Sequence, residues 1–115
     1  IIIPVPIHKK RKQERGYNQT ELIAKEISKN ITNLTLKKDI LFKIKDIEPQ
    51  SKLTKNQRKE NIRNAFEIKK EEEIKDKNIL LFDDIYTTGS TVNECSRKLK
   101  KAGVKSIGVL TIAKD

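Results

Sequence analysis

The strongest constraint on the fold is a run of four apolar residues, Ile-Leu-Leu-Phe, at positions 79–82. The run is short and apolar at every position, which is typical of a parallel strand whose sheet is covered on both faces. The polar segment 71–78 precedes it. Residues 107–112 form a second apolar run, which predicts another strand.

Between these two runs, the spacing of apolar residues predicts a helix from Thr91 to Gly103. Gly103 suits the left-handed residue that ends many helices. The apolar stripe of this helix consists of Val92, Cys95, Leu99 and Ala102. Cys95 is the only cysteine, so it cannot form an internal disulfide, and we expect a buried, inert thiol in a reducing compartment.

The first half of the chain adds further elements. Residues 1–7 are rich in isoleucine, but Pro4 and Pro6 allow a strand there only near its end. Residues 40–45 alternate in polarity, which predicts a strand with one wetter face. Between them, Thr20 precedes a helical pattern. The face of this helix that we expect in the core consists of Ile23, Ala24, Ile27 and Ile31.

Residues 49–65 form a long polar segment. Thr54 and Gln57 match a capping box, which predicts the start of a helix. This helix has few apolar residues before Ile62 and cannot bury much surface. We therefore expect the segment to be weakly packed and mobile.

Strands and helices alternate along the chain, which predicts an α/β fold with an open, mainly parallel sheet and flanking helices. Its 115 residues suit one domain, residues 1–115, and 35% hydrophobic residues allow only a small core. No apolar run approaches the roughly 20 residues that span a bilayer, so we expect no membrane insertion and a cytoplasmic protein. The chain starts inside an apolar run and lacks methionine, so we expect it to be part of a longer protein.

The residues between the strand at 79–82 and the next helix carry the chemistry. Ligands of open parallel sheets bind at the carboxyl ends of the strands, and residues 83–91 occupy that place. Asp83 and Asp84 come first, and adjacent carboxylates at the end of a buried strand need hydroxyl or cationic partners. Hydroxyl groups and a glycine follow at Thr87, Thr88, Gly89, Ser90 and Thr91. With the amino end of the helix they suit a phosphate, and the carboxylates suit a sugar diol, so the segment predicts a sugar 5-phosphate site.

Other interpretations of these residues fit less well. A nucleotide-triphosphate loop would end in Gly-Lys-Ser or Gly-Lys-Thr after an earlier glycine, and this chain has no such sequence. A phosphoacceptor receiver domain would place its paired acids near the start of the chain. Alone, Thr-Thr-Gly-Ser-Thr could be a helix cap and a tight turn, but the acids and the buried strand before it favour a ligand site.

The charge of the chain is strongly positive, with 26 Lys and Arg against 16 Asp and Glu and a formal net charge of +10. Basic residues cluster at positions 8–16, 51–64 and 97–105. Such an excess favours polyanionic partners, either a phosphorylated metabolite or nucleic acid. For the third cluster, a solvated lysine-rich surface is the simpler interpretation.

Three segments carry a family resemblance. The sequence LLFDDIYTTGST is similar to the signature of type I phosphoribosyltransferases. Together with PVPIHKKRKQERGYNQTELIAKEI and PQSKLTKNQRKENIRNAFEI, in this order along the chain, it resembles the ComF family of competence-associated proteins. The resemblance implies a type I phosphoribosyltransferase-like fold and a site for phosphoribosyl pyrophosphate with its Mg²⁺.

The resemblance also implies roles for individual residues. The 5-phosphate would bind at Tyr86, Thr87, Thr88, Gly89, Ser90 and Thr91. Asp83 and Asp84 would be the catalytic-site acids that hold the ribose hydroxyls. The pyrophosphate would meet Lys9, Lys10 and Arg11 in a loop at residues 8–15, and Arg58 and Lys59 in a flexible loop. Mg²⁺ would arrive on the ligand, with no metal ligand assigned to the protein.

Two functions remain open from the sequence. The first is a phosphoribosyltransferase, in which an amine or base displaces pyrophosphate from the ribose. The second is a component of the DNA-uptake machinery that senses phosphoribosyl pyrophosphate or binds single-stranded DNA. No acceptor-deprotonating residue is evident, which weakens the first. The cysteine-rich zinc module and the acceptor-recognising hood of such proteins have no counterpart in these 115 residues.

Overall fold

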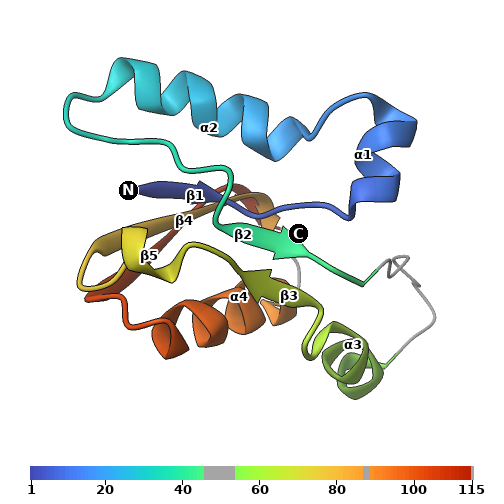
Figure 1. The fold of residues 1–115 in the computed structure, drawn as a ribbon. Coiled ribbons are helices and arrows are strands. Elements are labelled where there is room, and N and C mark those ends of the chain that lie inside the picture. The colour runs from blue at the N-terminus through green and yellow to red at the C-terminus, as the bar shows by residue number, and fades with distance from the viewer. Residues whose placement is uncertain (46–53, 87–88, 115) are drawn as a thin grey trace.

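The computed structural model describes residues 1–45, 54–86 and 89–114. Its main sheet has three parallel strands in the order β1 (Ile2–Pro4), β4 (Asn78–Tyr86) and β5 (Ser106–Lys114). Helix α2 (Gln19–Asn30) lies over one face of this sheet and α4 (Ser90–Lys101) over the other (Figure 1). The predicted α/β fold with a mainly parallel, open sheet is therefore confirmed.

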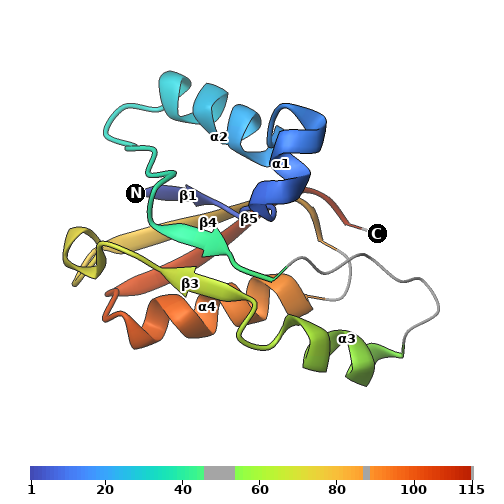
Figure 2. The ribbon, with the colours of Figure 1, turned by 45° about the vertical axis from the view of Figure 1, so that its right-hand side comes forward.

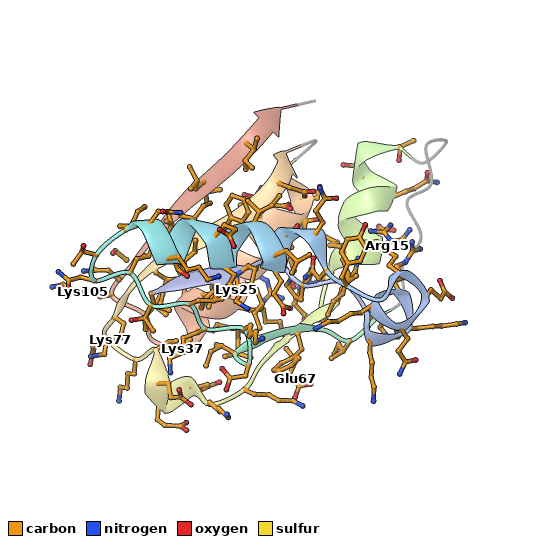
Figure 3. The ribbon with its side chains drawn as sticks, turned by 90° about the horizontal axis from the view of Figure 1, so that it is seen from above. Arg15, Lys25, Lys37, Glu67, Lys77 and Lys105 are labelled. Atoms are coloured by element: carbon orange, nitrogen blue, oxygen red, sulfur yellow. The ribbon has the colours of Figure 1, made fainter. Side chains whose placement is uncertain are left out.

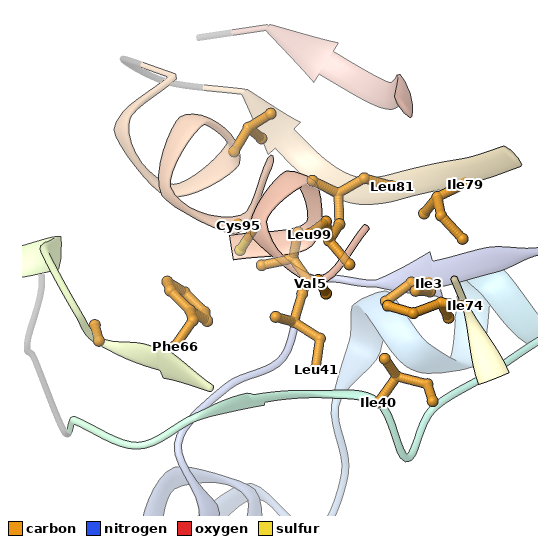
Figure 4. Close-up of a cluster of buried hydrophobic side chains, with 13 residues drawn as sticks. Ile3, Val5, Ile40, Leu41, Phe66, Ile74, Ile79, Leu81, Cys95 and Leu99 are labelled. Carbon is orange, nitrogen blue, oxygen red and sulfur yellow. The ribbon is translucent and has the colours of Figure 1, made fainter. Parts of the chain in front are cut away.

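The alternation of side chains along β4 divides the core into two parts. The larger cluster lies on the α4 face, where Ile79 and Leu81 pack with Leu99 and Cys95 (Figure 4). The smaller cluster lies on the α2 face and contains Ile2, Ala24 and Phe82. The apolar run at residues 79–82 thus serves both faces, as predicted for a covered parallel strand.

A second sheet lies on the α4 side and was only half predicted. Strand β2 (Leu41–Lys43) pairs antiparallel with β3 (Phe66–Ile68), and Phe66 is almost fully buried in the larger cluster. The sequence predicted β2 but gave no sign of β3, because three residues are too few to show a period. Helix α3 (Lys55–Ile62) precedes β3 and begins with the predicted capping box. The Thr54 hydroxyl accepts from the Gln57 amide at 3.1 Å, and the Gln57 side chain accepts from the Thr54 amide at 2.9 Å.

The two long helices differ slightly from their predicted limits. Helix α4 begins at Ser90, and Gly103 after it has a φ of 90°, the left-handed conformation that was predicted. Helix α2 begins after Asn18, whose side chain accepts from the Thr20 amide at 3.1 Å. The prediction that Ile31 belongs to the core face is wrong, because α2 ends at Asn30 and Ile31 is half exposed.

The remaining elements are short. A single 3-10 turn, η1 (Glu71–Glu73), leads into β4, and helix α1 (Lys9–Arg15) follows β1. Strand β5 forms one edge of the main sheet and leaves Leu110 and Ile112 substantially exposed. Among the described residues, no helix is both long and apolar enough to cross a bilayer.

Candidate functional site

The predicted site lies where the parallel strands end. The carboxyl end of β1 leads into α1, and the carboxyl end of β4 leads toward the start of α4, on the same side of the sheet (Figure 2). This is the edge at which ligands of open parallel sheets bind. The chain thereby brings the predicted 5-phosphate segment and the predicted pyrophosphate residues to one edge.

The two predicted acids lie within β4 and not in a loop after it. Strand β4 continues to Tyr86, because Asp83 pairs with Thr111 and Tyr86 with Lys114 of β5. Adjacent side chains of a strand point to opposite faces, so Asp83 shares the α4 face with Leu81, and Asp84 shares the α2 face with Phe82. Both aspartates are partly buried. The two carboxylates that were predicted as a neighbouring pair therefore lie on opposite faces of the same strand.

The charge of Asp83 affects the pKa of Cys95, which lies in the core on the α4 face. Burial first, and then the nearby charge of Asp83, raises the pKa of the Cys95 thiol well above its ordinary value, while the Lys43 ammonium acts in the opposite direction. Cys95 is fully buried, as predicted for an inert thiol. Lys43, at the end of β2, was not among the predicted site residues, and it reaches this neighbourhood because β2 pairs with β3, which packs against α4.

The start of α4 has the backbone geometry that the phosphate prediction requires. Gly89 precedes the helix with φ 80° and ψ −4°, a conformation that a residue with a Cβ rarely adopts. Its carbonyl accepts from the Asn93 amide at 2.8 Å, so the helix is regular from its first turn. Ser90 is buried and Thr91 partly buried. Thr87 and Thr88 lie outside the described residues, as does the side chain of Tyr86.

The predicted pyrophosphate residues lie on a helix, which corrects the prediction of a loop at residues 8–15. Helix α1 forms because the His8 side chain caps it, accepting from the Lys10 amide at 3.1 Å, and Gly16 ends it with a φ of 80°. Lys9 and Lys10 are exposed, and Arg11 is partly buried. A capping histidine has no regular sequence signal, which is why the helix was missed.

Asn18 lies in the polar turn between α1 and α2 and was not among the predicted site residues. Its side chain is buried, caps α2, and donates to the Val5 carbonyl at 3.4 Å. This bond joins the start of α2 to the segment that leaves β1. Asn18 therefore has a structural purpose in the turn after α1.

The residues that tie α3 to α4 were also missed. The buried Glu94 carboxylate accepts from the Asn64 amide at 2.9 Å and from Arg97 Nε and Nη2 at 2.8 and 2.7 Å. Arg97 Nη2 also donates to Asn64 Oδ1 at 3.0 Å. The Arg97 guanidinium, followed by the Asn64 amide, holds the pKa of Glu94 below its ordinary value although burial acts in the opposite direction. We call this set of three residues the Glu94 joint.

An open groove of about 450 Å³ runs between α3 and α4 beside this joint. It is lined by Glu60, Ile62, Arg63, Ser90, Asn93, Glu94 and Arg97. Ser90 belongs to the predicted phosphate segment, so the groove opens beside that segment. Arg58 and Lys59, the basic residues predicted for the flexible loop, belong to α3, and their side chains lie outside the described part.

Comparison with known proteins gives a consistent result. Residues 18–115 match the family model of the phosphoribosyl transferase domain. Competence protein F of Haemophilus influenzae is 38% identical over 98% of this chain and 49% of its own length. Competence protein ComFC of Bacillus subtilis is 30% identical over 100% of this chain and 45% of its own. DNA utilization protein YhgH of Escherichia coli (strain K12) is 29% identical over 94% of this chain and 46% of its own length.

The chain thus spans about half the length of the curated relatives it matches. No solved structure matches it.

Proposed function

This chain belongs to the phosphoribosyl transferase domain family, and on that premise we propose that it binds phosphoribosyl pyrophosphate at the carboxyl end of β4. Relatives named competence protein F and ComFC confirm the resemblance to the ComF family. We further propose that the whole protein serves DNA uptake or use, as the names of these relatives and of DNA utilization protein YhgH suggest.

One observation carries the ligand proposal: the left-handed Gly89 precedes the first turn of α4, a few residues after a strand that has two acids near its carboxyl end. The first amides of a helix have no partner within the helix, and they attract anions. The 5-phosphate would bind there, together with the hydroxyls of Thr87, Thr88, Ser90 and Thr91. Asp83 and Asp84 would accept hydrogen bonds from the ribose hydroxyls, approaching the sugar from the two faces of β4.

The basic residues would hold the other end of the ligand. Lys9, Lys10 and Arg11 on α1, and Arg58 and Lys59 on α3, would stabilise the charge that develops on the pyrophosphate as it leaves. The protein would thus act by holding the ligand and by electrostatic stabilisation, with little proton transfer of its own. An amine or base would be the acceptor.

Magnesium fits this arrangement as a companion of the ligand. The described residues contain no group of three or more His, Cys, Asp or Glu side chains that could form a cage around a metal ion. Mg²⁺ usually keeps several waters and binds through one or two carboxylates plus substrate phosphates, and Asp83 or Asp84 could supply such a contact. The ion would neutralise charge on the pyrophosphate.

The test compares two glycine substitutions in the full-length protein. Gly89→Ala and Gly103→Ala each place a Cβ on a left-handed residue, at φ 80° and 90°, so each costs about 1–2 kcal/mol of stability. Gly103 lies at the opposite end of α4, where a Cβ would meet only the Lys75 side chain at 3.6 Å. Calorimetry with phosphoribosyl pyrophosphate and Mg²⁺ should show at least a tenfold weaker affinity for Gly89→Ala. The affinity of Gly103→Ala should equal that of the wild type. No heat with the wild-type protein would refute the proposal.

Turnover is a separate question, and pyrophosphate release decides it. Release on addition of an amine or base acceptor would establish a transferase. Binding without release from any acceptor would favour the sensor, in which the same site reports the ligand concentration.

A second proposal, binding of single-stranded DNA, is favoured by five exposed lysines at the far end of the molecule from α1. These far-end lysines are Lys75, Lys77, Lys100, Lys101 and Lys105. Two hydrogen bonds bring their turns together, from the Asp76 amide to the Gly103 carbonyl at 2.9 Å and from the Lys105 amide to the Lys77 carbonyl at 2.8 Å. Figure 3 shows Lys77 and Lys105 at one end and Arg15 of α1 at the other.

The far-end lysines suit an extended phosphate chain because they are exposed and no ion pair holds them in the part of the chain that the structure describes. Within the described ranges, none of them is part of an ion pair, whereas Lys37 and Lys70 nearby pair with Glu73 and Asp39 at 2.8 and 2.6 Å. Arg97, which the sequence grouped with this cluster, is held by Glu94 and does not belong to it. A site here would be separate from the phosphoribosyl pyrophosphate site.

Salt dependence tests this second proposal. A labelled single strand is titrated at several salt concentrations, and the logarithm of the binding constant is plotted against the logarithm of the salt concentration. The magnitude of this slope should fall by about 1.4 in the double variant Lys75→Gln, Lys105→Gln, because each lost phosphate contact removes about 0.7. Lys25→Gln with Lys38→Gln removes the same charge elsewhere and should leave the slope unchanged. Asp83→Asn with Asp84→Asn should weaken phosphoribosyl pyrophosphate and spare DNA. If this double variant lost affinity for phosphoribosyl pyrophosphate and for DNA to the same degree, the two ligands would not bind at separate sites.

A further inference from the structure

Helix α3 has too little apolar surface to be placed by packing. Of its described side chains, Ile62 alone is partly buried, and Asn56, Gln57, Glu60 and Asn61 are exposed. The hydrophobic effect is non-directional and roughly proportional to buried area, so a helix with one apolar contact has no preferred position from this source. Something else must fix α3 beside α4.

The Glu94 joint supplies directional contacts at the end of α3. Asn64 lies two residues after α3 and is held twice by α4, through its amide to Glu94 and through its side chain to Arg97. Its φ of 57° is left-handed, a conformation that asparagine tolerates better than most residues. A buried carboxylate that accepts three hydrogen bonds, two of them from a guanidinium, tolerates little displacement.

Two further hydrogen bonds next to the joint connect the residues on either side of the segment that contains α3. The Ile44 amide donates to the Ala65 carbonyl at 2.7 Å, and the Lys45 ammonium donates to the Arg63 carbonyl at 2.9 Å. The two ends of the segment are thus bound to each other next to Asn64. A change at Glu94 would therefore move both ends of the segment relative to α4.

The position of the joint links it to the ligand site. Glu94 lies about one turn after Ser90, the first residue of α4, and both line the same groove as Glu60 and Arg63 of the α3 side. The distance between α3 and the amino end of α4 therefore sets the width of the groove beside the proposed phosphate segment.

We propose that Glu94 is a positioning residue: with Arg97 it holds Asn64, and through Asn64 it keeps the basic residues of α3 available to a ligand bound at the start of α4. The part of this inference that concerns binding rests on the proposed function. Glu94 need not touch the ligand. Its contribution is to place a helix that has too little apolar surface to be placed by packing.

A double-variant experiment separates positioning from general stabilisation. Phosphoribosyl pyrophosphate affinity is measured by calorimetry in the full-length wild type, Glu94→Gln, Arg58→Ala and the double variant. If Glu94 acts by placing α3, Glu94→Gln should lose roughly tenfold in affinity. The double variant should then lose clearly less than the product of the two single losses, because both remove the same contribution.

Amide exchange without ligand supplies the second readout. In Glu94→Gln the Asn64 amide and the amides of α3 should exchange roughly tenfold faster, because the bonds that hold α3 to α4 are lost. Glu26→Gln is the matched control, since Glu26 forms an exposed pair with Lys29 on α2, and it should change neither readout. If Glu94→Gln fails to fold, Asn64→Gly removes the side-chain bond to Arg97 and keeps the left-handed backbone, and the same results are expected.

The outcomes are distinct. Wild-type binding with unchanged affinity in Glu94→Gln would overturn the positioning role and leave the proposed function intact. Losses that multiply in the double variant would likewise overturn it, because they would show that Glu94 and Arg58 act independently. Absence of binding in the wild type would refute the proposed function and this role together, and the exchange data would still show whether the joint holds α3.

Discussion

Helices α3 and α4 lie side by side but are held by different physical means. Helix α4 is strongly amphipathic, with Val92, Cys95 and Leu99 buried against the sheet. Helix α3 presents mostly polar side chains and is fixed by a capping box at its start and by the Glu94 joint just after its end. Apolar packing secures the helix that carries the proposed phosphate site. Directional polar bonds secure the helix that would bring cations to it.

The difference has a functional meaning. Detaching the packed helix α4 would unfold the protein, whereas detaching α3 would break only a few hydrogen bonds and leave the main core in place. In the proposed site, α4 would supply a wall fixed by packing, and α3 a wall whose position depends on the Glu94 joint. Each of the following predictions tests this contrast.

The largest effect is expected from removing apolar volume in α4. Leu99 is fully buried, so Leu99→Ala should lower the free energy of unfolding by about 2–5 kcal/mol. Leu22→Ala on α2 removes the same atoms from a side chain that is 51% exposed and should change stability by less than about 1 kcal/mol. Urea unfolding of both variants measures the difference. Equal losses would mean that the α4 stripe is not the main source of stability.

The next effect concerns the charge of Glu94 and depends on pH. Because the folded-state pKa of Glu94 is lowered, its ionised form stabilises the protein above the ordinary glutamate pKa of about 4.3, and this contribution is lost as pH falls through the folded value. At pH 7, Glu94→Gln should cost about 1.5–3 kcal/mol. The free energies of unfolding of wild type and variant are measured in urea between pH 7 and 3. The difference between them should become smaller only in the acid range. A gap independent of pH would mean that the charge contributes nothing.

A smaller effect separates the backbone of Asn64 from its side chain. Both Asn64→Gly and Asn64→Ala lose the bond to Arg97, but only alanine is strained at a φ of 57°. Asn64→Ala should therefore be less stable than Asn64→Gly by about 1 kcal/mol. Thermal unfolding of the pair measures this difference. The reverse order would show that the left-handed backbone is not maintained in solution.

The smallest and most local effect is expected at the start of α3. Thr54→Ala removes the acceptor of the Gln57 amide and should cost about 1 kcal/mol, confined to the first turn of the helix. Amide exchange of residues 55–58 should become roughly fivefold faster while the main sheet is unaffected. Gln13→Ala, an exposed substitution in α1, is the control and should leave these amides unchanged. Loss of protection throughout the sheet would contradict the separation of α3 from the core.

The sequence by itself determined the parallel strands at 79–82 and 107–112, the stop of α4 at Gly103, the buried Cys95 and the capping box of α3. Each depends on a period or a cap within a few residues, and such interactions persist in any fold that contains the segment. The proposed phosphate segment could be predicted for the same reason, since its acids, hydroxyls and glycine are contiguous.

Only the tertiary structure decided that β4 continues through both aspartates and turns them to opposite faces, because that extension depends on pairing with β5. Pairing across a long stretch of chain also created β3, and contact with α4 created the Glu94 joint, whose partners are 30 residues apart. Hydrogen bonds between distant segments form only after the chain has closed around its core, so local sequence carries no signal for them. The acids, hydroxyls and glycine of the proposed phosphate segment are neighbours in the sequence, whereas the residues that hold α3 beside α4 are not.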